Sequence, residues 1–373
     1  MKFKVFVFVL VCMVSVFSLP VFANETDDII NRQKEDYNIE EIDDYIPDSA
    51  RENAEEYGEL SIENAKELIG VQTVFAFCWK SFLSVFGNKI RLVVELLALA
   101  FLMWLFNVMN ERDKNPGLQK ILSYATVAAA AVIFFETVFS ASQTLISQCG
   151  ELLTFLGALL PVLLTLTAAG GYGATASAVG VTTSFGLSIV AFLINSFIMP
   201  FTAMYMSLGI AAAMTDSVDF KRISQSIKNI VAGAFAGFFC VFSAVMVSQK
   251  YFALAGDSLS RRTLKLAAGS FLPLAGAGIS EGVDTAFACA AVLRTSVGGL
   301  GVAVLFFTII PPILEILATL IIISLARAIC GFFENETLAS FFTVISNVFM
   351  ILLTVSALSA LIIFLALAVL VKI

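Results

Sequence analysis

The chain has 373 residues, of which 59% are hydrophobic and only 14% charged, with a mean hydropathy of +0.93 and a formal net charge of −7. Soluble domains carry about 25% charged residues, so this composition excludes an ordinary soluble protein and indicates an all-α polytopic integral membrane protein. Histidine is absent, and the six cysteines are widely spaced. We therefore expect no metal, no cofactor and no catalytic residue.

The first 70 residues are predicted to be exported. Residues 1–23 resemble a signal peptide, with Lys2 and Lys4 before an apolar core and Val21-Phe22-Ala23 at its end. An uncleaved anchor is the alternative. Residues 24–70 hold 16 acidic and 4 basic residues, so the acidity of the chain comes from this segment. We expect a partly disordered extracytoplasmic strap with one amphipathic helix, either solvated or docking a partner.

Residues 71–91 are aromatic and weakly basic. Trp79, Lys80, Lys89 and Arg91 are typical of an interfacial helix at the membrane surface. The alternative is that this segment simply begins the first membrane span.

The polytopic membrane domain is predicted over residues 92–373, with about seven spans and a range of six to eight. Residues 181–214 form a run of 34 residues without charge, whereas one crossing needs about 20. We expect a hairpin or a re-entrant piece there, which keeps the basic loops at 112–120 and 221–228 both cytoplasmic. The expected apolar runs are 92–109, 121–139, 145–168, 181–214, 230–247, 300–326 and 341–371.

Glycines suggest both close helix packing and helix breaks. Gly233 and Gly237 form a Gly-x-x-x-Gly pattern, which lets two membrane helices approach closely. Two glycine-broken regions, 170–180 and 269–301, fall in the two halves of the chain, as the paired broken helices of transporters do.

The second region contains Gly278-Ile279-Ser280-Glu281-Gly282, a formal Gly-x-Ser-x-Gly pattern. A serine nucleophile needs a base and a preceding strand. Histidine is absent, so a Ser–Lys dyad is the remaining alternative, and the residues before Ser280 are small, apolar and interrupted by proline rather than strand-like. The nearest lysine, Lys265, belongs to a basic stretch suited to a membrane surface. We interpret the pattern as a chance match, although an intramembrane hydrolase stays formally open.

These glycines are instead predicted to form a re-entrant or gating element beside a polar path, because irregular backbone at membrane depth needs protein or water to satisfy it. An extramembrane loop with a surface helix is the alternative. The residues singled out in this element are Gly269, Pro273, Gly276, Gly278, Glu281, Gly282, Asp284 and Arg294.

Four glutamates fall within predicted spans, where ionisable groups are costly and usually functional. No predicted span offers an interior lysine or arginine to neutralise them. Glu95 and Glu151 are near span ends, and Glu136 is close to one. Glu315 follows Pro311-Pro312 in a long apolar run and is the strongest candidate for a pore-lining group.

The stretch from Lys265 to Glu315 resembles the stage III sporulation protein AE family of endospore-forming bacteria. The pattern that carries the resemblance runs from Lys265 through Gly269, Pro273 and Gly276 to Asp284. It continues through a glycine-rich turn at 298–301 and a proline in the next span. The signal peptide, polar exported segment and polytopic body also match the family plan.

The resemblance implies a non-enzymatic component of a secretion-like channel from mother cell to forespore, in the mother-cell membrane around the forespore. It implies partners from the same operon, including a cytoplasmic ATPase, and a forespore membrane protein, with a homo-oligomer in the bilayer and no nucleic acid. The chain itself has no Walker loop, so energy must come from a partner or an ion gradient. A stand-alone small-solute transporter and a scaffold without a passage remain alternatives.

Overall fold

The computed structural model describes residues 39–113, 116–214, 220–271, 276–332 and 336–371, with some side chains inside the helices left out, among them those of 276–286. The signal-peptide prediction for 1–23 lies outside these residues. Every long element described is a helix, and no strand occurs among the described residues. The chain therefore forms the all-α fold that its composition predicts.

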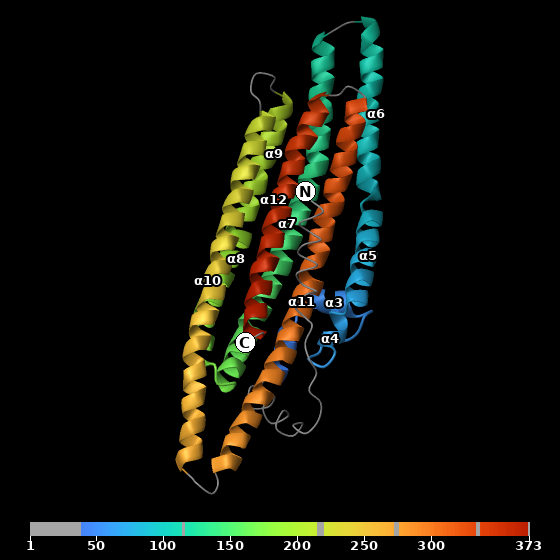
Figure 1. Cartoon of the computed structure of the whole chain (residues 1–373). Helices are drawn as coiled ribbons and strands as arrows, with labels where there is room; N and C mark the ends of the chain where they lie inside the picture. The colour runs from blue at the N-terminus through green and yellow to red at the C-terminus, as the bar shows by residue number, and fades with distance from the viewer. Residues whose placement is uncertain (1–38, 114–115, 215–219, 272–275, 333–335, 372–373) are drawn as a thin grey trace.

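The long helices run up and down in one elongated bundle, with α8 and α9 forming a single pass in one direction (Figure 1). Their bounds are α6 (Ile90–Asp113), α7 (Pro116–Ala169), α8 (Gly173–Phe192), α9 (Ile198–Met214), α10 (Phe220–Phe271), α11 (Gly276–Phe332) and α12 (Glu336–Val371). A short N-terminal module precedes them and consists of a 3₁₀ helix (Ile39–Tyr45), α3 (Asp48–Ala54), α4 (Ala65–Leu68) and α5 (Val71–Asn88).

The bundle has two distinct ends. At the upper end in Figure 1, the Tyr124 hydroxyl of α7 donates to the Met214 carbonyl of α9 at 3.3 Å, and the Asn347 amide of α12 donates to the Ser224 hydroxyl of α10 at 2.9 Å. At the lower end α7 turns into α8 through Gly171, which has φ of 83°. That turn confirms the glycine break expected within 170–180, since a positive φ favours glycine.

Two predicted span boundaries are wrong. The runs 121–139 and 145–168 belong to one unbroken helix of 54 residues, α7, and Pro161 does not end it. The run 181–214 is not a hairpin, because α8 and α9 continue through one π-helical turn at Leu193–Phe197. The helix does not reverse direction, although Asn195 and Pro200 lie in this run.

Five helices of the described residues are long and apolar enough to cross a membrane; α6, predicted to span at 92–109, is not among them. Their apolar parts are 121–169, 173–214, 222–260, 287–331 and 337–371. The 54 residues of α7 extend about 81 Å, whereas the hydrocarbon core of a bilayer is about 30 Å thick. These helices therefore continue well beyond one bilayer.

Helix α11 forms the centre of the bundle, and its glycines serve packing. A Cβ built at Gly298 would lie 2.0 Å from a Val371 methyl of α12, and one at Gly301 would lie 2.6 Å from Leu159 of α7. The glycine-rich turn expected at 298–301 is therefore wrong: the residues lie inside a continuous helix, where the missing side chains admit two neighbouring helices.

The described part of the acidic segment is folded, not a solvated strap. Ile42, Ala50 and Leu68 are at most 2% exposed, and the segment packs on α7 and α11. Its described charged side chains are exposed, whereas its apolar side chains pack against the bundle. The number of charges alone therefore did not predict that this segment packs. For residues 39–70 the alternative of a solvated tail is therefore wrong, and docking onto another protein stays a prediction.

Candidate functional site

The proline pair of α11 is held by the N-terminal module. Pro311 has no N–H, so it leaves the Phe307 carbonyl, one turn earlier, without its helical hydrogen bond. The Asn53 side-chain amide of α3 donates to this carbonyl at 3.0 Å. A residue 254 positions away along the chain thus replaces the bond that the proline removes.

An aromatic cluster surrounds the same turn. The Phe77 ring of α5 lies 4.8 Å from Phe307 and 5.4 Å from Phe306, centroid to centroid. Tyr57 lies 5.8 Å from Phe77, edge to face. Such pairs add about 0.5–1.5 kcal/mol each beyond their buried area, so they fasten α5 to the proline-containing turn.

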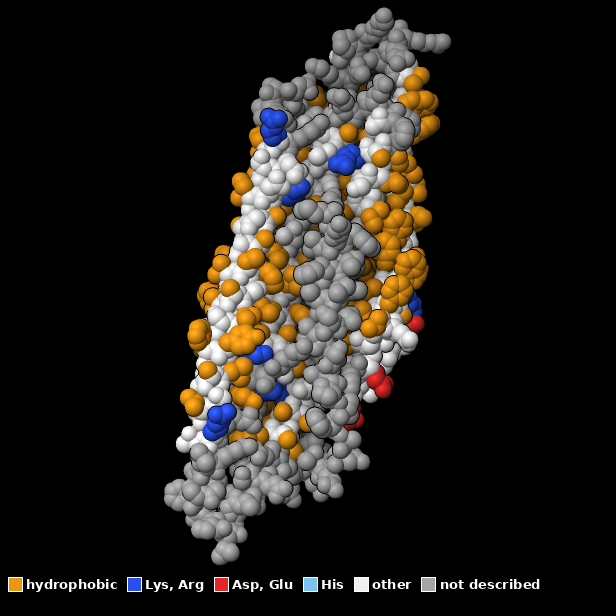
Figure 2. Space-filling view, viewed as in Figure 1, with side chains coloured by type: hydrophobic (Ala, Val, Ile, Leu, Met, Phe, Trp, Pro, Cys, Tyr) orange, Lys and Arg blue, Asp and Glu red, His pale blue; other side chains and the backbone are white. Residues whose placement is uncertain are grey.

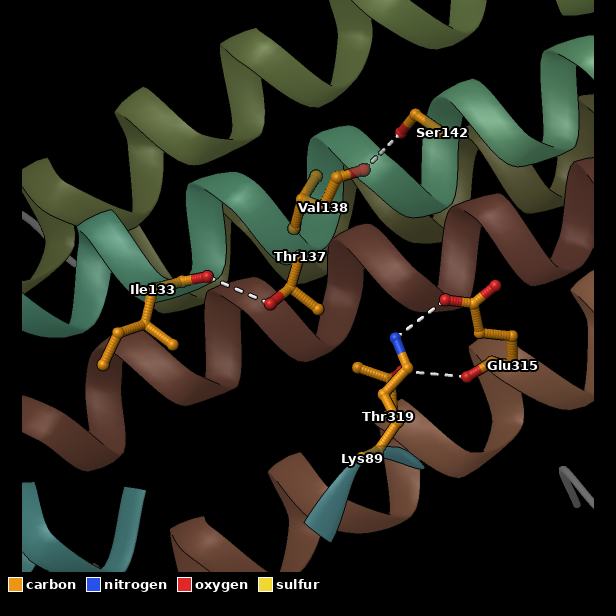
Figure 3. Close-up of polar contacts among 7 residues, drawn as sticks. All are labelled: Lys89, Ile133, Thr137, Val138, Ser142, Glu315 and Thr319. Atoms are coloured by element: carbon orange, nitrogen blue, oxygen red, sulfur yellow. Dashed lines mark hydrogen bonds and ion pairs between the residues drawn. The ribbon is translucent and has the colours of Figure 1, made fainter. Parts of the chain in front are cut away.

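Glu315 has a cationic partner. The Lys89 ammonium, at the junction of α5 and α6, lies 2.8 Å from the Glu315 carboxylate, and the two side chains are 17% and 24% exposed (Figure 3). The Glu315 carbonyl also accepts a hydrogen bond from the Thr319 hydroxyl at 2.8 Å. The partner comes from outside the predicted spans, since Lys89 belongs to the segment 71–91, and Glu315 thus forms an ion pair between helices.

The other three glutamates differ from one another. Glu151 accepts a hydrogen bond from Ser49 of the N-terminal module at 2.8 Å. Glu95 pairs with Arg91 on its own helix at 2.8 Å. Glu136 is exposed on α7. The two with long-range partners, Glu151 and Glu315, both bind the N-terminal module or its junction with α6.

A second polar cluster lies at the lower end. The Asp257 carboxylate of α10 is 3% exposed and accepts hydrogen bonds from the Ala174 and Thr175 amides at 2.9 and 2.8 Å, and from the Thr175 hydroxyl at 2.6 Å. Asp257 thus caps the first turn of α8 from another helix, where the helix dipole favours negative charge.

Arg294 of α11 lies near this capped turn. Its side chain is 4% exposed, and its guanidinium carbon lies 5.8 Å from the centroid of the Tyr172 ring, directly before α8. The structure therefore brings together the two glycine-rich regions 170–180 and 269–301, although they meet through Tyr172 and Arg294 rather than as two broken helices.

The remaining predicted site residues lie near the junction of α10 and α11. Gly276, Gly278, Glu281, Gly282 and Asp284 lie on α11, but their side chains are outside the described part. Gly269 lies on α10, and Pro273 falls in the gap between the helices. The described backbone shows no re-entrant piece here. Ser280 is also helical, so the strand-to-helix elbow of a hydrolase is absent at this serine.

Gly233 and Gly237 do not pack against the described part of the chain. Both are exposed on α10, and a Cβ built at either would meet nothing within 4 Å. None of the described helices therefore uses this Gly-x-x-x-Gly pattern.

An apolar groove of about 380 Å³ lies between α7 and α9 near the upper end. Tyr124, Ala131, Phe135 and Met214 contribute to its lining. Its walls offer hydrocarbon surface and hardly any polar atoms, so it has the character of a lipid-facing crevice rather than a solute site.

Sequence reasoning missed Asn53 and Asp257. Asn53 is one polar residue in a polar segment, and only its distance from Pro311 in space reveals its role. Asp257 could have been noticed, because it is an isolated carboxylate in the run Tyr251–Ser260, which otherwise lacks charge. A lone charge in an apolar helix requires a partner.

The fold and both polar clusters define a polytopic α-helical membrane protein whose N-terminal module is fastened to its central helix. A family model described as stage III sporulation protein AE matches residues 53–373. The chain belongs to this family, so its role lies in sporulation. It is 27% identical over 281 residues to stage III sporulation protein AE of Bacillus subtilis (strain 168), covering 74% of this chain and 70% of that protein. No solved structure matches the chain.

Proposed function

We propose that this protein is a membrane component of a mother-cell-to-forespore channel and forms its membrane passage or the platform for it. The observation that carries the proposal is the family match over 53–373, which includes nearly all of the described fold. The long helices support it, because a bundle that extends far beyond one bilayer can contact proteins outside the membrane.

The charge distribution supports one orientation in the mother-cell membrane. The upper end adjoins the basic stretches at 112–120 and 221–228, and positive residues favour the cytoplasmic side. The N-terminal module then lies on the extracytoplasmic side, beside the lower half of the bundle in Figure 1. This places the hydrocarbon in the upper half, because the module carries exposed charges such as Asp44, Glu52 and Glu55.

In this proposal the chain is not an enzyme, and partners provide the energy. Proteins of the same operon, including a cytoplasmic ATPase, would meet the upper end. A forespore membrane protein would meet the lower end. The fastening of the N-terminal module to α11 supports this division, since it gives the extracytoplasmic half a rigid surface.

The test combines a sporulation assay with a flux assay. A strain lacking the protein should fail to mature forespores, and the wild-type chain should restore them. Purified protein in vesicles together with its partners should pass a small fluorescent dye, whereas protein-free vesicles should not. Normal spores in the deletion strain would contradict the proposal.

A stand-alone transporter is the second candidate, and the meeting of Tyr172 with Arg294 near a capped helix end favours it. It differs in one measurable respect. A transporter alone in vesicles would show saturable uptake of one solute, whereas the channel component would show flux only with its partners.

A further inference from the structure

Helix α11 has a weak turn at its two prolines. Pro311 and Pro312 have no N–H, so two successive helical hydrogen bonds cannot form. The carbonyls that lose their donors are those of Phe307 and Thr308, four residues earlier. Prolines inside a helix usually bend it, yet α11 is one continuous α-helix from Gly276 to Phe332.

Another helix with a proline shows a local adjustment that α11 lacks. Pro200 of α9 lies three residues after the π-helical turn at Leu193–Phe197. A π-helical turn changes the backbone of the helix itself, and such turns and prolines are where helices bend. The described residues of α11 contain no π-helical turn, so what keeps its proline turn regular comes from other parts of the chain.

Helix α5 contacts α11 on both sides of the proline pair. Before the prolines, the Phe77 ring packs on Phe306 and Phe307. After them, Lys89 at the end of α5 pairs with Glu315 at 2.8 Å. Phe77 and Lys89 are 12 positions apart and Phe306 and Glu315 are nine, or about 18 and 14 Å along a helix. Helix α5 therefore bridges the weak turn.

Asn53 adds a contact at the weak turn itself. Its side-chain amide donates to the Ser49 carbonyl at 2.7 Å and to the Phe307 carbonyl at 3.0 Å. The bond to Ser49 holds the amide on α3, so the Phe307 carbonyl is bonded only when α11 keeps its present shape. An opened turn would lose this hydrogen bond.

We propose that Asn53, Phe77 and Lys89 together form a brace that controls the turn of α11 at Pro311-Pro312. The docked N-terminal module keeps the turn closed, and release of the module lets the turn open. A contact that fits only one of two conformations shifts the equilibrium toward that conformation. The coupling is reciprocal, so an open turn also weakens the docking of the module.

The brace is accessible from water, whereas the rest of the turn is buried. Lys89 and Glu315 are 17% and 24% exposed, and partly exposed ion pairs are weak attachments. Figure 2 shows charged side chains at the edge of the molecule where the module lies, below a hydrophobic flank. Ile309, Ile310 and Ile313 are at most 3% exposed against the bundle, so the opening is confined to this turn.

The brace depends on contacts within one chain. It requires neither the proposed passage nor the proposed orientation in the membrane, so its test is independent of both.

Hydrogen exchange of the α11 amides tests the brace. Exchange is followed by mass spectrometry on the purified full chain in detergent, in a peptide covering 305–318 and in a reference peptide covering 198–214 of α9. Lys89→Ala removes one end of the brace. Lys80→Ala is the matched control, because Lys80 also lies on α5 and forms an ion pair, but its partner Glu56 belongs to the module.

We expect Lys89→Ala to raise the exchange rate in the 305–318 peptide by about fivefold or more, because local opening controls exchange. Glu315→Gln breaks the same ion pair from the other side and should have the same effect. Lys80→Ala should change the rate by less than about twofold. Unchanged rates in both Lys89→Ala and Glu315→Gln overturn the proposal, and so does an equal rise in Lys80→Ala.

A second background separates control of the turn from general loosening of the protein. In a Pro311→Ala/Pro312→Ala chain the helix regains both N–H donors, so Lys89→Ala should raise the rate by less than about twofold. The same rise as in the proline-containing chain overturns the proposal. An equal rise in the reference peptide of α9 also overturns it, because Lys89 would then stabilise the whole bundle.

Discussion

The most apolar parts of helices α10 and α11 are nearly equal in hydropathy and lie in opposite environments. The most apolar windows of their spans have mean hydropathies of 2.4 and 2.3, yet 11% of the α10 window and 78% of the α11 window are buried within the chain. Hydropathy therefore marks both as membrane helices without distinguishing the flank from the core. The difference is in particular glycines: Gly298 and Gly301 of α11 face neighbouring helices, and Gly233 and Gly237 of α10 face outward.

The largest expected effect comes from filling a glycine contact of α11. Gly298→Leu should destabilise the fold by about 3 kcal/mol or prevent folding, because a Cβ at this position already meets Val371 at 2.0 Å. Thermal unfolding followed by size-exclusion chromatography in detergent measures it.

Gly331→Leu on the same helix is the matched control, since nothing lies within 4 Å of a Cβ there. Equal melting temperatures for the two variants would show that α11 is not packed through Gly298.

The next effect concerns the one deeply buried carboxylate described on α10. Asp257→Ala should cost about 2 kcal/mol, because the Ala174 and Thr175 amides lose their acceptor at the start of α8. The melting temperature of the purified protein reports this loss. Ser258→Ala, at the adjacent exposed position, should leave it unchanged. A stable Asp257→Ala variant would mean that water replaces the carboxylate.

A smaller effect tests the hydrogen bond between the Asn53 side chain and the Phe307 carbonyl of α11. Asn53→Ala should cost about 1–2 kcal/mol, because the Phe307 carbonyl loses its donor. In a Pro311→Ala background the helix regains its own N–H donor, so the same Asn53→Ala change should cost much less. A double-mutant cycle of melting temperatures measures the coupling. Additive effects of the two substitutions would show that Asn53 does not replace the N–H donor that Pro311 lacks.

The smallest effect is a change in thiol reactivity on α5. Burial raises the pKa of the Cys78 thiol to about 11, so little reactive thiolate exists near neutral pH. In a variant whose only cysteine is Cys78, maleimide labelling should be slow at pH 7.5 and faster at pH 9.5. Phe77→Ala should increase the rate at pH 7.5 by loosening α5 from α11. Unchanged labelling in that variant would show that Phe77 does not hold α5.

The sequence allowed much of the fold to be predicted but little of the site. Apolar runs identified the helices, and the positions of Gly171 and the basic loops indicated where some of them end. The joined helix at 121–169 was missed because the polar stretch at 140–144 interrupts the apolar run without ending the helix. Glu315 was singled out from the sequence, but Lys89 is 226 residues away, so the pairing of these two residues could not be inferred from spacing.

By itself, the sequence determined that this chain is helical, membrane-bound and without histidine chemistry, because composition and hydropathy act locally and do not depend on packing. Its pattern from Lys265 to Glu315 also carried the family. Only the tertiary structure decided that the described acidic residues fold onto α11, that Asn53 replaces the hydrogen bond removed by Pro311, and that the described residues bury little of α10. Each of these depends on which distant side chains share a surface, and that information exists only when the helices are assembled.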